Sequence, residues 1–184
     1  MENKDNVARI ERNPEATRKR ILEAAFMEIY RKGFQGMRLD DVLNTTELTK
    51  GALYHHFPNK RALGYAVVDE VILPIMDEMW LEPLKKAQDP LQGLIDVVEQ
   101  LPEMKPPEII EYGCPLNNLA QEMSPLDEDF RQRLDYVFRL WHDVTEEALE
   151  RAKHQGKIRE SIDCDETATF SMAALEGCIG ISNN

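Results

Sequence analysis

Apolar residues recur every three or four positions along most of the chain, and this spacing predicts helices rather than strands. The longest such run begins at Phe130 and ends near Gly156, with its apolar positions on one side of a helix. They are Phe130, Leu134, Val137, Phe138, Trp141, Val144 and Leu149. No segment of the body alternates with period two, so we expect an all-α protein.

The first predicted helix has clear signals at both ends. Asn13 is a good N-cap, Pro14 suits the first helical position, and Gly33 is a typical residue for the end. The apolar face between them consists of Ile21, Leu22, Ala25, Phe26 and Ile29. Near the helix start lie three cations, Arg18, Lys19 and Arg20. They either form a solvated face or contact phosphate, and both interpretations remain open.

Two short helices separated by a tight turn are predicted next. Leu39, Val42 and Leu43 have the i, i+3, i+4 spacing of a helix that ends near residue 45. Thr49 is the N-cap of the second helix, and Pro58 ends it because the residue before a proline is disfavoured in a helix. Together they form a helix-turn-helix.

The second helix of this pair has one apolar side and one polar side. Leu53 and Phe57 are four residues apart and share the apolar stripe. The polar side carries a cation, a small residue, a phenol and an imidazole, which suit phosphates and base edges in a DNA groove. These residues are Lys50, Gly51, Tyr54 and His55.

Another helix is predicted to start directly after Pro58. Asn59 is its N-cap, which places Lys60 and Arg61 in the first turn, where the helix dipole disfavours cations. A DNA phosphate held by Lys60 and the free N–H groups of this turn would supply the missing negative charge.

The run Leu53-Tyr54-His55-His56-Phe57-Pro58-Asn59-Lys60 resembles the L-Y-x-H/Y-F-x-x-K hallmark of the tetracycline-repressor-like (TetR) family of bacterial transcriptional regulators. The resemblance continues upstream through Gly33-Phe34 and Asp41-Val42 and covers residues 14–65. It implies a three-helix helix-turn-helix DNA-binding domain with an N-terminal arm in residues 1–60. A helical ligand-binding and dimerisation domain would follow in residues 61–184. The implied function is that of a homodimeric repressor, which a small-molecule effector releases from a palindromic double-stranded DNA operator.

The helix-turn-helix departs from the family pattern in two places. Met37 and Arg38 lie where the family usually has a hydroxyl residue, and Glu47 stands at the usual glycine of the turn. A residue other than glycine at positive φ costs on the order of 1 kcal/mol, so Glu47 puts the usual turn backbone in question. Arg38 offers a charged bond to phosphate in place of a hydroxyl. The expected DNA-binding residues are Arg38, Thr49, Lys50, Gly51, Ala52, Tyr54, His55 and Lys60.

The body of the chain is predicted to be helical. A long apolar pattern follows residue 59, and Pro74 is expected to bend this helix. Asp89-Pro90 opens the next helix, and residues 102–107 are expected to form a loop before another helix starts at Gly113-Cys114-Pro115. The residues expected to face inward from the helix after Pro90 are Leu91, Leu94, Ile95, Val98 and Leu101.

The last predicted helix starts near Asp165 and is rich in small residues that leave room for close helix approach. In the TetR family the last two helices of each subunit form a four-helix dimer interface, and this helix resembles the first of the two. A second does not appear before Asn184. A missing C-terminal helix and a shortened natural end both remain open.

Several residues of the body are suited to line an apolar pocket with a few polar points. Each is also a candidate core residue, and a histidine such as His142 on a largely apolar helix is typically a hydrogen-bonded structural residue. Cys114 near a helix N-terminus is either an unreactive thiol or one whose lowered pKa permits reaction with electrophiles or oxidants. The candidate ligand-binding residues are Met79, Trp80, Asn117, Phe138, Trp141 and His142.

The formal net charge of −12 is distributed unevenly along the 184 residues. Residues 1–63 carry 12 Lys and Arg against 9 Asp and Glu, whereas the remainder carries 10 against 25. A mildly basic head on an acidic body suits a DNA-binding protein whose body is repelled by the duplex. Ordinary scatter in composition is the alternative explanation.

The composition also argues against several other classes of protein. No apolar run approaches the ~20 residues needed to cross a bilayer, and the N-terminus has no signal-peptide core, so we expect a cytoplasmic protein. Three widely spaced cysteines indicate neither a disulfide framework nor a zinc motif. The sequence has no glycine-rich phosphate loop, no HExxH and no Ser/His/Asp order. We therefore expect no enzymatic activity, no cofactor and no metal.

Three alternatives to a repressor remain open at this stage. An activator with the same fold would differ only in its effect on transcription. A helical protein-interaction module would not show the steep salt dependence of DNA binding. A helical enzyme would turn over the metabolite that a regulator only binds.

Overall fold

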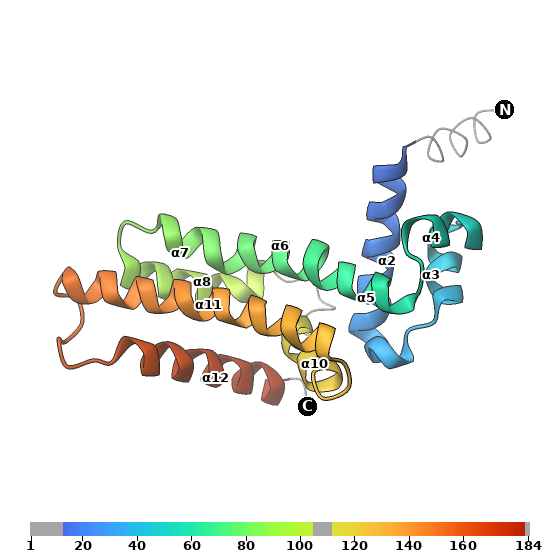
Figure 1. Cartoon of the computed structure of the whole chain (residues 1–184). Helices are drawn as coiled ribbons and strands as arrows, with labels where there is room; N and C mark the ends of the chain where they lie inside the picture. Colours follow the sequence, from blue (N-terminus) through green and yellow to red (C-terminus); the bar gives the residue numbers. More distant parts are fainter. Residues whose placement is uncertain (1–12, 105–111, 183–184) are drawn as a thin grey trace. The chain divides into compact units, whose positions relative to one another are not determined.

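Helices are the only regular secondary structure in residues 13–104 and 112–182, which are the residues that the computed structural model describes (Figure 1). The expectation of an all-α fold is confirmed. Contacts between residues divide the chain into two units, one ending at Val71 and the other beginning at Ile72. This division lies further along the chain than the boundary at residue 60 that the sequence suggested. No helix in the described ranges combines the length and apolarity needed to cross a membrane.

The first helix of the N-terminal unit, α2 (Pro14–Gly36), begins as its sequence predicts. The Asn13 side chain accepts a hydrogen bond from the backbone N–H of Ala16 at 3.2 Å, as an N-cap should. Gly33 has a φ of 73° and interrupts the helical backbone, so its predicted role as the helix end is confirmed. The apolar face of α2 is buried, with Ile21 and Ala25 fully inaccessible.

Three shorter helices complete this unit: α3 (Leu39–Thr46), α4 (Lys50–His56) and α5 (Lys60–Val67). Thr49 and Asn59 cap α4 and α5, as predicted, by accepting from the backbone N–H groups of Ala52 and Ala62 at 3.2 and 2.8 Å. The core between the helices contains Val42, Leu53, Phe57 and Leu63. Within this unit, α2 makes its most extensive contacts with α3 and α5.

The helical run that starts at α5 continues to Lys86 and changes its winding at two prolines. The π-helical segment η1 (Val68–Ile72) precedes α6 (Leu73–Met76), and η2 (Asp77–Leu81) precedes α7 (Glu82–Lys86). Pro74 and Pro83 lie in the first turns of α6 and α7. Because proline has no N–H and its ring crowds the preceding turn, a wider turn is one way to accommodate it. The perturbation expected at Pro74 thus appears as π-helical winding on both sides of it.

The helix α8 (Pro90–Met104) starts at the predicted place, where Asp89 accepts from the N–H of Gln92 at 3.1 Å. The predicted inward face is only partly buried: Leu91 and Leu94 are half-buried, Ile95 and Val98 are 43% and 45% exposed, and the unpredicted Val97 is buried. The side chain of Leu101, also predicted to face inward, lies outside the described part of the chain. The predicted loop is also displaced, because residues 102–104 still belong to α8 and residues 105–107 lie outside the described residues.

Within residues 112–182 the C-terminal unit continues with three more helices: α10 (Pro115–Met123), α11 (Glu128–His154) and α12 (Cys164–Ser182). Helices α11 and α12 lie side by side (Figure 1) and share the most extensive contact between any two elements. The predicted apolar face of α11 is buried, except that Phe138 is half-buried. The largest fully buried side chains of this unit include Leu84, Leu116, Phe130 and Leu134.

Candidate functional site

The polar side of α4 is exposed, as the sequence predicts. Lys50, Gly51, Tyr54 and His55 are all accessible to solvent, and Tyr54 is 50% exposed. On the opposite side, Leu53 is 1% exposed and holds the helix against the core of the unit. An exposed phenol on an anchored helix is available to a partner without any rearrangement of the fold.

Thr49 has a structural role that leaves room for a second one. Its Oγ1 accepts from the N–H of Ala52 and caps α4, and the side chain itself is exposed. A capping hydroxyl uses its oxygen as acceptor and keeps its own O–H as a donor. Thr49 can therefore donate to a phosphate at the helix start while it caps the helix.

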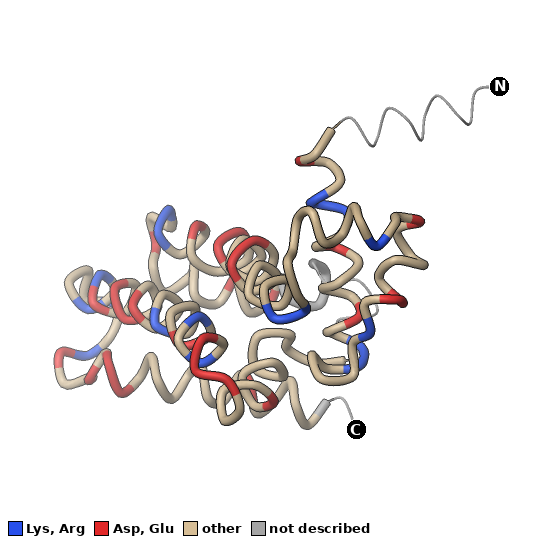
Figure 2. Tube along the Cα trace, turned by 45° about the vertical axis from the view of Figure 1, so that its right-hand side comes forward, with Lys and Arg blue, Asp and Glu red and all other residues tan. Residues whose placement is uncertain are grey.

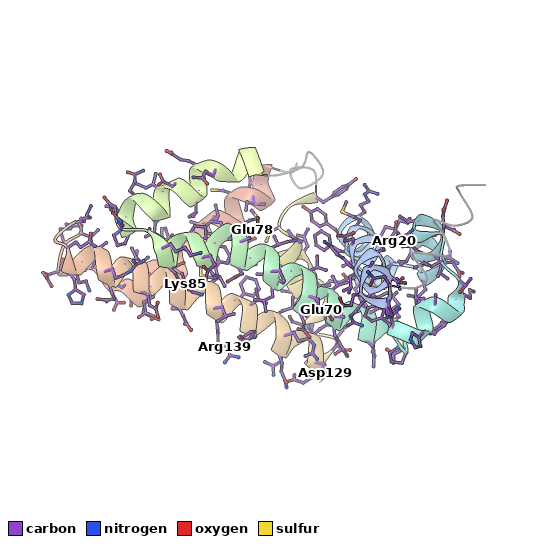
Figure 3. The ribbon with its side chains drawn as sticks, turned by 90° about the horizontal axis from the view of Figure 1, so that it is seen from above. Arg20, Glu70, Glu78, Lys85, Asp129 and Arg139 are labelled. Carbon is purple, nitrogen blue, oxygen red and sulfur yellow. The ribbon has the colours of Figure 1, made fainter. Side chains whose placement is uncertain are left out.

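The turn between α3 and α4 keeps a left-handed residue although it has no glycine. Glu47 has a φ of 55° and a ψ of 27°. Arg20 supports this turn, because its Nη2 donates to the carbonyl oxygen of Thr46 at 2.7 Å. Figure 3 shows that Arg20 comes from α2. Arg20 thus has a role that the sequence did not indicate, which is to hold the last carbonyl of α3.

Lys50 forms an exposed ion pair with Asp40, with 3.0 Å between Nζ and the carboxylate oxygen. The hydrogen bond to Asp40 raises the pKa of Lys50 above its usual value, so the ammonium is charged at neutral pH. Exposed pairs of this kind contribute little net stability. Exchanging Asp40 for a phosphate would therefore cost the protein little.

The two remaining cations proposed for phosphate contact differ in their surroundings. Arg38 is exposed at the N-cap position of α3 and makes no side-chain capping bond. Lys60 instead donates from Nζ to the carbonyl oxygen of Gln35 at 3.1 Å and lies 5.0 Å from the centroid of the Phe34 ring. Lys60 is therefore already engaged in joining α5 to the end of α2.

Arg18 links three parts of the N-terminal unit, which the sequence did not reveal. Its Nη2 and Nε donate to Glu70 at 2.5 and 3.0 Å, and its guanidinium lies 4.4 Å from the centroid of the Phe57 ring. Its Nη1 also donates to the carbonyl oxygen of His56 at 3.4 Å. Arg18 thus joins α2, the end of α4 and η1. Arg18 and Glu70 are 52 residues apart in the sequence. No local sequence pattern indicates a contact over that separation.

The cavities of the C-terminal unit lie around a pair of tryptophans. The rings of Trp80 and Trp141 are 4.9 Å apart between centroids and tilted by 47°. We call the larger space, of about 470 Å³, the main cavity; residues of α8, α11 and α12 line it together with Trp80. A narrow space of about 50 Å³ shares both tryptophans and includes Met79, and we call it the side cavity. A main cavity of this size matches ordinary ligand pockets.

Three of the six predicted ligand residues line one or both of these cavities, namely Met79, Trp80 and Trp141. Within the described parts of the chain, Asn117, Phe138 and His142 do not line either one. The Nε2 atom of His142 instead lies 3.2 Å from the Thr169 hydroxyl and 3.4 Å from an Asp165 carboxylate oxygen. These contacts join α11 to α12, in agreement with the structural interpretation of this histidine.

Cys114 does not have the lowered pKa that was one of its two interpretations. Burial, and as the second cause the nearby Glu176 carboxylate, together raise the pKa of the thiol to about 12. The thiol lies at the N-cap of α10 but makes no side-chain capping bond. Its environment therefore disfavours the thiolate that reacts with electrophiles.

The fold and the exposed face of α4 define a class: helical proteins that carry one helix-turn-helix for DNA beside a helical unit with a cavity. Residues 21–67 match the family described as bacterial regulatory proteins, tetR family, and residues 88–183 match the tetracyclin repressor-like, C-terminal domain. The chain belongs to the TetR family of bacterial transcriptional regulators.

Individual relatives support the same assignment. The HTH-type transcriptional regulator LmrA of Bacillus subtilis is 30% identical over 90% of this chain and 86% of its own length. An HTH-type regulator from the lacX 3' region of Lactococcus lactis is 34% identical over 66% of this chain, and the match spans only 62% of that relative. The crystal structure of a TetR regulatory protein from Rhodobacter sphaeroides superposes with a TM-score of 0.81, at 25% identity over 90% of this chain and 87% of its own.

Proposed function

We propose that this protein is a ligand-responsive repressor that binds a palindromic operator as a homodimer. The observation that carries the proposal is the polar side of α4, exposed on a helix whose opposite side is anchored in the core. In a helix-turn-helix protein the second helix enters the major groove and reads base edges. Lys50, Gly51, Tyr54 and His55 would occupy that groove.

Phosphate contacts would orient α4 in the groove. Thr49 has a hydroxyl proton available, and Arg38 is an exposed cation at the start of α3. Ala52 would lie close to the backbone of the duplex, but its N–H already donates to Thr49. Lys60 would contribute mainly through the α5 terminus, because its ammonium already bonds to Gln35. Such contacts fix the register of the protein on the duplex but do not read the sequence.

The outward side of α12 supports dimerisation. Phe170 and Ile181 are 73% and 77% exposed, and with Ala174 and Gly177 they lie at the spacing of one helix face. A side chain added at Gly177 would meet nothing within 4 Å in the same chain. An apolar helix face with small residues at its centre suits a second helix at close distance. A second copy of this chain would cover it and place two α4 helices on one duplex.

Ligand binding in the C-terminal unit would control the DNA affinity. Trp80 lines both cavities, and it belongs to the helical run that begins at α5, directly after α4. A ligand that contacts Trp80 differently in two positions of this run would shift the population between them. Release from DNA then follows if the ligand prefers the position that fits the operator less well. Action on chromosomal DNA also implies the cytoplasmic location that the sequence predicts.

A gel shift with the DNA flanking the protein's own gene tests this proposal. We expect retardation of that fragment at protein concentrations that leave an unrelated duplex of the same length free, and loss of the shifted band when an effector is added. Transcription from the same promoter in vitro separates the two modes of regulation: a repressor lowers the transcript, whereas an activator raises it. Equal retardation of both duplexes would contradict the proposal.

A further inference from the structure

The hydroxyl groups of the main cavity are arranged as acceptors. Thr145 donates its O–H to the carbonyl oxygen of Trp141 at 2.8 Å, and Ser171 donates to the carbonyl oxygen of Thr167 at 2.7 Å. Each hydroxyl has one proton, so these protons are already used within α11 and α12. The two oxygens keep lone pairs with which they accept a hydrogen bond from a molecule in the cavity.

The charged residues around the cavities have one sign. Glu99 lines the main cavity, and Glu176 lines the side cavity. Among the described residues, Lys, Arg and His are absent from both linings.

The walls are apolar and aromatic. Leu91, Leu94 and Met172 face the main cavity, and the paired rings of Trp80 and Trp141 form a wall that both cavities share. Tryptophan is the aromatic side chain that attracts cations most strongly through the face of its ring.

We propose that the effector is an amphiphilic organic cation, in which an apolar or aromatic body carries one protonated amine. The body occupies the main cavity against the tryptophans, and the ammonium donates to the Thr145 and Ser171 oxygens and pairs with Glu99. A carboxylate of the same size would meet acceptors and a like charge in the same place. The inference rests on the proposed function, because it specifies the ligand of the cavity that controls DNA binding.

The tryptophans provide a direct measurement, because Trp80 and Trp141 are the only two in the sequence and both line the cavities. The probes are 4-tert-butylbenzylamine, which is protonated at neutral pH, 4-tert-butylbenzyl alcohol and 4-tert-butylbenzoate. Titration of the full chain is followed by tryptophan fluorescence. We expect the amine to bind about tenfold more tightly than the benzoate, with the alcohol between them. Equal or tighter binding of the benzoate would overturn the proposal, and so would the failure of all three probes to bind.

The variant Glu99→Gln removes the charge at the main cavity. It should weaken binding of the amine about threefold, as expected for a partly exposed ion pair, and leave the alcohol unchanged. Glu147→Gln is the matched control, because Glu147 is exposed on α11 outside both linings. The double variant Glu99→Gln and Glu176→Gln should lower the affinity for the amine to that for the alcohol. No loss of amine affinity in Glu99→Gln or the double variant would contradict the assignment of these carboxylates.

A gel shift in the presence of the amine separates this inference from the proposed function. If the amine binds but the operator stays bound at saturating amine, the result supports the cation site and contradicts ligand-controlled release from DNA. If the benzoate releases the operator and the amine does not, the result supports a ligand-responsive regulator and contradicts the cation site.

Discussion

Tyr54 is the residue whose substitution should most clearly change DNA binding without changing protein stability. Because its side chain is 50% exposed, Tyr54→Ala should leave the thermal midpoint nearly unchanged. It should nevertheless weaken operator binding by about 1–3 kcal/mol, as the loss of a groove contact does. Tyr136→Ala is a matched control, since Tyr136 is also 50% exposed but lies on α11. Equal loss of affinity in both variants, measured by fluorescence anisotropy, would exclude a specific role for Tyr54.

His56 should make the stability of the protein depend on pH. Desolvation, followed by the nearby charges of His55 and Arg18, lowers the pKa of His56 below its usual value of 6.5. The unfolded chain then binds a proton at a pH where the folded chain does not, so stability falls as the pH drops below about 7. We expect the thermal midpoint of the wild type to fall more between pH 7.5 and 5.5 than that of His56→Gln. Parallel pH dependences of the two proteins would contradict this role.

Local signals at single residues were predictable, whereas distant partners were not. Asn13, Thr49 and Asn59 cap helices because their side chains bond to an N–H three residues away, and such bonds follow from the sequence alone. Arg18 and Lys60 bond to groups 52 and 25 residues away. Their partners depend on how the helices pack, so the sequence left Arg18 undecided and gave Lys60 only a role toward phosphate.

At the scale of elements, the turn between α3 and α4 stores backbone strain. Glu47 adopts a left-handed conformation that glycine adopts without a steric penalty. Glu47→Gly should therefore stabilise the folded state by about 0.5–1 kcal/mol in denaturant unfolding, after the higher entropy of the unfolded glycine chain is included. Glu147→Gly in the middle of α11 is the control and should cost about 1 kcal/mol. A loss of stability in Glu47→Gly would show that the carboxylate itself supports the turn.

The outward face of α12 is the surface on which the proposed dimer depends. Phe170→Glu places a charge on the apolar face that a second copy would cover, so the protein should become monomeric at micromolar concentration. Light scattering coupled to gel filtration measures this directly. Tyr136→Glu changes another exposed aromatic residue, which lies on α11, and should leave the dimer intact. A wild-type protein that is already monomeric would remove the basis for the dimer.

Helix positions followed from periodicity, but two details of the elements did not. Part of the predicted inner face of α8 is exposed, because Ile95 and Val98 border the main cavity, whereas Leu94 also packs against a core cluster of α11 and α12. Apolar spacing cannot distinguish a core from a cavity wall. The π-helical turns next to Pro74 and Pro83 were also missed, since an expected bend does not specify how the hydrogen bonds rearrange.

At the scale of the whole molecule, charge and family assignment agree on a DNA-binding head and an acidic body. Residues 1–63 have a formal charge of +3 and the remainder −15. Acidic residues recur along the helices of the C-terminal unit, interspersed with basic ones (Figure 2). Only the excess of acidic over basic residues in the second part of the chain was predictable from composition. The cavity and its paired tryptophans required the folded structure, because α8, α11 and α12 and the helical run of Trp80 come from distant parts of the chain.

The most direct test of the central claim is a footprint of the protein on the DNA upstream of its own gene. We predict a protected palindrome whose half-sites are about one helical turn apart, since each subunit would place one α4 in the major groove. Protection should disappear with Tyr54→Ala at concentrations that protect the site with wild-type protein. A wild-type protein that binds the fragment but protects no defined site, or a Tyr54→Ala variant with an unchanged footprint, would contradict the claim that α4 reads the operator.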